Sequence, residues 1–267
     1  KKPNVYYIVP DGYPNAEALK AIFNLDATDF YEHLKLSRFT IYPSTFSNYT
    51  YTLASISSVL GMDHHYYRGS IGNFEFLNAR KFIVSEQSPV VKIFRNNGYQ
   101  VHYVHEDQFL FLSGCFVDSC WPMAFWGELN DILVPPSLKS IPLLARVNEA
   151  ITARRVSKDD EQSRSEFMQR VLEHIDLMSE QYMPHFTYIH AINPSHSFPS
   201  EQTSEQLASF RKDYFKQIQI ANDEMLSMVS HILTRDPSAL IIVNADHGAW
   251  GYGNTHYSKK EILESVS

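Results

Sequence analysis

The stretch Ala239-Leu240-Ile241-Ile242-Val243-Asn244-Ala245-Asp246-His247-Gly248 predicts a strand that ends in polar residues. Its first five residues are all apolar, which is typical of a strand buried on both faces of a parallel sheet. A second apolar run, VYYIV at residues 5–9, ends in Pro10-Asp11-Gly12. Both runs therefore stop at a turn that carries a carboxylate.

Between these two runs, predicted helices alternate with predicted strands. We expect helices over residues 16–23, 26–36, 52–60, 88–96, 157–182 and 203–234, and further strands over residues 39–42, 100–104 and 185–190. Asp26 or Thr28 is expected to cap the second helix. Because strands separated by helices need crossover connections, we predict an α/β fold with a mostly parallel central sheet flanked by helices on both faces, a three-layer sandwich.

Composition excludes several classes of protein. The chain has 267 residues, of which 44% are hydrophobic and 13% aromatic, so it is not a disordered tail. The formal net charge of −7, without a run of Lys or Arg, argues against nucleic-acid binding. No apolar run reaches the roughly 18 residues of a membrane span. No linker interrupts the sequence, so we predict one domain over residues 1–267, with residues 109–142 as an irregular insertion or lid.

The two cysteines, Cys115 and Cys120, lie five positions apart. One interpretation is a small disulfide loop formed in an oxidising compartment. The other is a pair of partly buried thiols. A structural zinc site needs four ligands, so this pair does not predict one by itself.

Residues that could carry chemistry follow the predicted strands, because ligands of open α/β sheets bind beyond the carboxyl ends of the strands. Asp246 and His247 offer an oxygen and a nitrogen ligand side by side, and Gly248 is expected to let the backbone turn sharply. Asp11 at the end of the first strand is, taken alone, also typical of a turn or a helix cap. Thr52 begins a predicted helix, where free N–H groups favour an anion, or it serves only as the N-cap.

Taken together, these short motifs resemble the alkaline phosphatase superfamily. They are NVYYIVPDG at residues 4–12, TLAS at 52–55, HFTYIH at 185–190, PSH at 194–196 and NADHG at 244–248. Their order along the chain is similar to that of the sulfatase-like branch, which includes the phosphoethanolamine and phosphoglycerol (lipoteichoic acid synthase-type) transferases.

The resemblance implies one divalent metal ion held by Asp11, Thr52, Asp246 and His247. Three oxygen ligands and one imidazole suit zinc or manganese. The resemblance further implies that Thr52 is the catalytic nucleophile and forms a phosphothreonine intermediate.

Two other histidines, His196 and His256, resemble substrate or second-metal ligands of this family, although each can also be an ordinary loop histidine. His190 and Asn193 are weaker candidates. We expect the remaining histidines near predicted strand or helix ends to lie outside the metal site; they are His64, His65, His102 and His105.

The sequence departs from true sulfatases, which need a Cys or Ser followed by Pro and Arg for conversion to formylglycine. Residues 52–55 lack that pattern, and threonine cannot form the aldehyde. The leading expectation is therefore a metal-dependent phosphotransferase or phosphoesterase that acts on a glycan- or lipid-linked phosphate ester. The alternatives are a catalytically silent domain that binds lipid or glycan, and a sulfatase-type hydrolase that uses unmodified threonine.

The resemblance also bears on location and on the termini. It implies an extracytoplasmic domain, periplasmic or at the cell surface, anchored through an N-terminal membrane segment that this sequence lacks. Relatives continue with another strand and helix after the last motif, so we expect either a compact variant or a chain trimmed at its C-terminus.

Overall fold

The computed structural model describes residues 2–64, 87–106, 117–121, 161–194 and 204–248. Their strands form one five-stranded sheet in which every pair is parallel. In spatial order the strands are β3 (Ser119–Trp121), β2 (Gln100–His105), β4 (His185–Ala191), β1 (Val5–Pro10) and β5 (Leu240–Val243). The predicted parallel α/β fold is confirmed.

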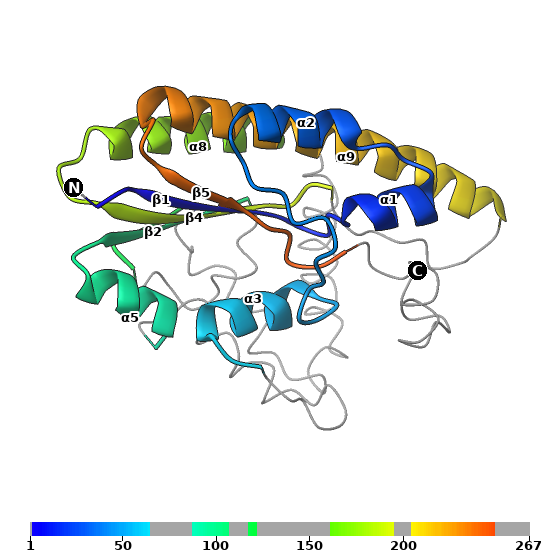
Figure 1. Cartoon of the computed structure of the whole chain (residues 1–267). Coiled ribbons are helices and arrows are strands. Elements are labelled where there is room, and N and C mark those ends of the chain that lie inside the picture. Colours follow the sequence, from blue (N-terminus) through cyan, green and yellow to red (C-terminus); the bar gives the residue numbers. More distant parts are fainter. Residues whose placement is uncertain (1, 65–86, 107–116, 122–160, 195–203, 249–267) are drawn as a thin grey trace, which may run out of the picture.

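Helices cover both faces of this sheet (Figure 1). On one face lie α1 (Ala16–Phe23), α2 (Thr28–Leu36), α8 (Glu161–Ser179) and α9 (Ser204–Arg235), and on the other lie α3 (Thr52–Gly61) and α5 (Pro89–Asn96). Successive strand residues point to opposite faces. Ile8 accordingly belongs to the core under α8 and α9, and Val9 belongs to the core under α3.

The two cores explain why β1 is a continuous apolar run and why every residue of β4 is buried. The expectation of burial on both faces is wrong for the edge strand β5, whose Leu240 and Ile242 are exposed. Ile8 and Ile189 are fully buried with Val171 of α8 and Val229 of α9. On the opposite face, Val9 and Tyr188 are fully buried in a cluster that also holds α3 residues. A strand covered on both faces has no position for an exposed polar side chain, so polar residues gather at its ends.

Three predicted elements differ from the structure. Residues 39–42 do not form a strand: Arg38 has a φ of 66°, which turns the chain, and Phe39 and Ile41 pack against the core as irregular chain. Helix α2 has Ala27 in its N-cap position, and the expected Asp26 accepts a hydrogen bond of 2.9 Å from the backbone N–H of Thr28, the first residue of the helix. Helix α8 ends at Ser179, before the predicted end at residue 182, and the first four residues of the predicted helix, 157–160, lie outside the described ranges.

Strand β3 was not predicted. It pairs with β2 at the edge of the sheet, within the stretch expected to be an irregular insertion at 109–142. The rest of that stretch, except residues 117 and 118, lies outside the described residues. Cys120 of β3 is disulfide-bonded, and Cys115, the other cysteine of the chain, also lies outside them. None of the described helices combines the length and apolar character that a bilayer span requires.

Candidate active site

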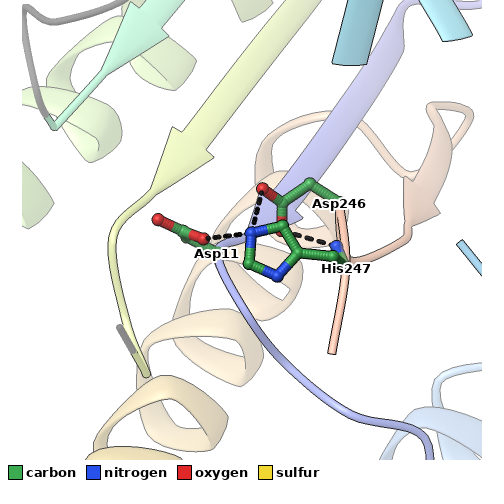
Figure 2. Close-up of side chains that lie close together, drawn as sticks. All are labelled: Asp11, Asp246 and His247. Atoms are coloured by element: carbon green, nitrogen blue, oxygen red, sulfur yellow. Dashed lines mark hydrogen bonds and ion pairs between the residues drawn. The ribbon is translucent and has the colours of Figure 1, made fainter. Parts of the chain in front are cut away.

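The carboxyl ends of β1 and β5 bring two distant parts of the chain together. The strands pair in parallel, with Ile8 opposite Val243, so the residues that follow them emerge at the same edge of the sheet. Figure 2 shows the side chains of Asp11, Asp246 and His247 converging there. His247 Nε2 lies 3.3 Å from Asp11 Oδ1 and 3.4 Å from Asp246 Oδ2. All three side chains are buried.

The turn after β1 fixes the Asp246 carboxylate. Gly12 has a φ of 70°, in the left-handed region that favours glycine. This conformation directs its N–H to Asp246 Oδ1 at 3.0 Å. The Gly12 carbonyl oxygen accepts a hydrogen bond of 2.7 Å from the Tyr214 hydroxyl in α9. The turn is thus held by Asp246, in the loop after β5, on one side and by α9 on the other.

The orientation of His247 leaves one ring nitrogen for the carboxylates. Its Nδ1 lies 2.7 Å from the Gly248 carbonyl oxygen, which can only accept a hydrogen bond, so Nδ1 carries the proton. Nε2 then faces Asp11 and Asp246. Gly248 itself does not have a positive φ, and an added Cβ would meet Pro14 only at an ordinary 3.9 Å. The expected need for glycine in a sharp turn at this position is therefore wrong.

Asp246 is kept ionised although it is only 1% exposed. Burial raises the pKa of its carboxyl group, but the His190 imidazole, the His247 imidazole and the Gly12 N–H outweigh this effect and lower the pKa to about 2. Asp246 Oδ2 has no hydrogen-bond partner among the described residues. A buried anionic oxygen of this kind is suited to a cation.

Thr52, from helix α3, lies beside these three residues. It is the first residue of α3, after Tyr51 in the N-cap position, so its hydroxyl does not serve as the N-cap. Its Oγ1 lies 3.4 Å from Asp11 Oδ1 and 3.2 Å from His247 Nε2. The side chain is half-buried, and the three other side chains are more deeply buried. We call Asp11, Thr52, Asp246 and His247 the candidate centre.

The donor set of the candidate centre fits a divalent cation. The ligand atoms of Asp11, Asp246 and His247 all lie within 4.8 Å of one another, and no other such group is found in the described part of the chain. Two carboxylates and one imidazole, with the Thr52 hydroxyl beside them, are ligand types that bind divalent metal ions.

The structure places the other predicted residues as follows. His196 and His256 lie outside the described residues, as does His65. His190 Nε2 lies 4.0 Å from Asp246 Oδ2, so it borders the candidate centre. Asn193 instead donates its side-chain hydrogen bond to Glu224.

The histidines expected to lie outside the metal site occupy different places. His64 is exposed after α3, and His102 lies near the amino end of β2. His105 is fully buried beside His190, with ring centroids 5.6 Å apart. Burial, and then the neighbouring His190, hold the pKa of His105 well below its usual range.

Two supporting residues were not identified as such from the sequence. Ser55 donates its hydroxyl hydrogen to the Asp246 carbonyl oxygen and so ties α3 to the loop after β5. A signal existed, because residues three apart on a helix share a face and Thr52 precedes Ser55 by three. Glu106 follows the end of β2 as Asp11 follows β1, and the same rule could have identified it.

Comparison with known proteins identifies the family of this chain. The family model described as Sulfatase matches residues 3–264. The chain belongs to the sulfatase family. Members of this family within the alkaline phosphatase superfamily are hydrolytic enzymes that use divalent metals, consistent with the ligand cluster found here.

Two solved structures of the protein Ps i-CgsB are also similar to this sulfatase-family chain. One has 13% sequence identity and a TM-score of 0.49. The other, a complex with k-i-k-neocarrahexaose, has 12% identity and a TM-score of 0.47. Each match covers 95% of this chain and 61% of the other, so the chain spans about three fifths of the length of these proteins. No curated protein matches the sequence significantly.

Proposed function

We propose that this protein is a metal-dependent phosphoesterase or phosphotransferase whose nucleophile is Thr52. The observation that carries the proposal is the position of Thr52 Oγ1, 3.2 Å from His247 Nε2 and 3.4 Å from Asp11 Oδ1. A hydroxyl that caps no helix and touches two buried metal-ligand groups is placed for chemistry.

The side chains of the candidate centre have separate roles in this proposal. Asp11, Asp246 and His247 hold a divalent cation, which would stabilise the deprotonated hydroxyl of Thr52 near neutral pH. Thr52 Oγ1 then attacks phosphorus in line, and the bond from phosphorus to the leaving oxygen breaks to give phosphothreonine. Water, or an acceptor hydroxyl, attacks the same phosphorus in the second step and releases Thr52. The leaving oxygen and Thr52 each take up a proton.

The N-terminus of helix α3 would stabilise the negative charge of the phosphoryl group. Thr52 opens the helix, and no side chain caps its first N–H groups. These groups and the helix dipole favour negative charge beside Thr52. The equatorial oxygens of the transferred phosphoryl group carry such charge in the transition state.

We further propose that the phosphate ester is linked to a glycan or a lipid outside the cytoplasm. The disulfide-bonded Cys120 supports an oxidising compartment. Thr52 is half-buried, whereas the three metal ligands are deeply buried. This arrangement supports a large substrate that inserts only its ester group into the site. Attachment to a membrane, and a second metal ion or substrate contacts at His196 and His256, belong to this proposal.

A sulfatase-type hydrolase is the second candidate, and membership of the sulfatase family favours it. The same centre would then attack sulfur in a sulfate ester. Threonine in place of the formylglycine precursor argues for phosphorus, because the aldehyde hydrate that sulfatases use cannot form from threonine. A silent binding domain is disfavoured because all four ligand positions hold competent side chains.

A substrate panel tests the proposal. The zinc- or manganese-loaded protein is incubated with 4-nitrophenyl phosphate, bis(4-nitrophenyl) phosphate and 4-nitrophenyl sulfate, and released nitrophenol is measured. We expect turnover of a phosphate ester, and acid quenching followed by peptide mass spectrometry should find phosphate on Thr52. Turnover of the sulfate alone would favour the second candidate. No turnover with any ester by a metal-loaded protein would favour the silent domain.

A further inference from the structure

Two glutamates hold the two residues that follow β4. Glu106 comes directly after β2, and its Oε2 accepts a hydrogen bond from the Ile192 backbone N–H at 2.8 Å. Glu224 of α9 accepts a hydrogen bond from Asn193 Nδ2 at 3.0 Å. Because the two carboxylates come from different elements, the segment Ile192-Asn193 is held on two sides.

This segment adjoins a ligand of the candidate centre. Ala191, the residue before Ile192, accepts a hydrogen bond of 2.8 Å from the Asp11 backbone N–H. The backbone N–H of Glu106 donates to the His190 carbonyl oxygen at 3.0 Å. A shift of Ile192 would therefore move the Ala191 carbonyl group, and with it the backbone that positions Asp11.

Burial makes the charged forms of Glu106 and Glu224 energetically unfavourable. Burial raises the pKa of Glu106 to about 7, and the Glu224 carboxylate adds to this effect, while the Ile192 N–H, His190 and Arg164 oppose it. Burial likewise raises the pKa of Glu224. A glutamine would accept the same hydrogen bond without a buried charge. The retained carboxylates therefore need an explanation beyond packing.

We propose that Glu106 and Glu224 are positioning residues that hold the segment after β4 and thereby set the place of Asp11, a proposal that rests on the function proposed above. The charged groups that face this pair are Arg164 of α8, His190 of β4 and Asp223 of α9. A carboxylate accepts a stronger hydrogen bond than a carboxylic acid does. The pKa of Glu106 is about 7, so the hydrogen bond from the Ile192 N–H to Glu106 weakens as the pH falls through this value.

Amide hydrogen exchange and zinc binding test this proposal. In the wild type, we expect the protection factor of the Ile192 amide to rise between pH 6 and pH 8. Glu106→Gln should keep substantial protection but lose this pH dependence, and Glu106→Ala should lower protection by about 10-fold or more at pH 8. Glu106→Ala should also weaken zinc binding by roughly 10- to 100-fold, as is typical when the support of a ligand is lost. Glu224→Gln and Glu106→Gln should cause smaller losses.

The control is Glu180→Gln, the same chemical change at an exposed position just beyond α8, which should alter neither measurement. Wild-type protection of Ile192 in Glu106→Ala would overturn the proposal, and so would an unchanged pH dependence in Glu106→Gln. Because exchange at Ile192 needs no turnover, an inactive protein with the expected exchange pattern would contradict only the proposed function.

Discussion

Among the described residues, buried histidines occur at both ends of this sheet, but only one end forms a candidate metal site. At the carboxyl edge, His247 lies against the ionised Asp246. Near the amino ends of β2 and β4, His102 lies 5.4 Å from His174 and 6.2 Å from His185 between ring centroids. We call these three residues the histidine cluster. Burial first, and then neighbouring imidazoles, lower the pKa of His174 to about 4 and that of His185 to about 3.

The partners explain the difference between the two ends. In the histidine cluster, His102 Nδ1 lies 2.7 Å from the Ser119 hydroxyl and His174 Nε2 lies 3.4 Å from the Thr187 hydroxyl. These are neutral partners, so the imidazoles stay neutral and pack like other core residues. At the candidate centre, two carboxylates face one imidazole and create negative charge that a cation can balance. A buried histidine therefore indicates a metal site only where a carboxylate lies beside it.

The largest effect should come from Thr52→Ala, which removes the only proposed nucleophile. We expect the kcat for aryl phosphate esters to fall by at least about 10³-fold, with the far-UV circular dichroism unchanged. Thr52→Ser should retain measurable turnover because it keeps the hydroxyl group. Thr50→Ala, at an exposed position two residues earlier, is the matched control and should behave as wild type. Full activity in Thr52→Ala would assign the nucleophile to another group.

The second-largest effect should come from Asp246→Asn, which compares the candidate centre directly with the histidine cluster. Asp246→Asn removes the charge of a buried ligand, and we expect the zinc dissociation constant to rise by more than about 100-fold, beyond the typical effect of an outer-shell change. His185→Gln, in the histidine cluster, should leave zinc content unchanged. Both can be measured by competition with a chelating dye. Loss of zinc from His185→Gln would show that the two ends of the sheet are not functionally distinct.

The histidine cluster should instead affect how the free energy of unfolding depends on pH. An unfolded histidine protonates near pH 6.5, whereas folded His174 and His185 protonate only near pH 4 and 3. The unfolded state therefore binds more protons below pH 6.5, and the free energy of unfolding falls with decreasing pH by up to about 1.4 kcal/mol per pH unit for each group. In urea titrations between pH 6 and 4.5, His174→Gln should show a shallower fall. The exposed His33→Gln should keep the wild-type slope.

The smallest effect should follow from Ser55→Ala, which removes the hydrogen bond to the Asp246 carbonyl oxygen. We expect a loss of about 1 kcal/mol in the free energy of unfolding and slightly weaker zinc binding. Ser57→Ala is a close control, because Ser57 is buried in the same helix and its hydroxyl has no hydrogen-bond partner in the described structure. Its removal should be neutral or stabilising. Equal losses in both variants would indicate a general packing effect.

Much of this fold was predictable because the central strands β1 and β4 are covered on both faces. The apolar edge strand β5 is a partial exception, because its Leu240 and Ile242 side chains are exposed. The apolar runs at β1 and β5 fixed both the parallel sheet and the edge at which Asp11 and Asp246 meet. Strand β3 was missed because its three residues, Ser119-Cys120-Trp121, are too few to show a pattern. Phe39 and Ile41 misled the prediction because they alternate like strand residues but pack as irregular chain.

The supporting contacts of the candidate centre were harder to predict than its ligands. Asp246 and His247 are recognisable by type and by position after a strand. Each role of Ser55, Gly12 and Glu106 depends on a hydrogen bond with a backbone group on one side. The positions of Ser55 and Glu106 gave a signal, but their backbone partners did not, because every residue offers such groups. Such contacts are defined only once the chain has folded.

The hydrogen bond from Gly12 to Asp246 joins residues 234 positions apart. Closing so long a loop is entropically costly, because β1 and the segment after β5 are far apart along the chain. Bound zinc would favour this closure, since ligands that bind only the native state stabilise it. Metal uptake would accordingly report that β1 and the segment after β5 have come together, and it offers a simple readout of folding at this edge of the sheet.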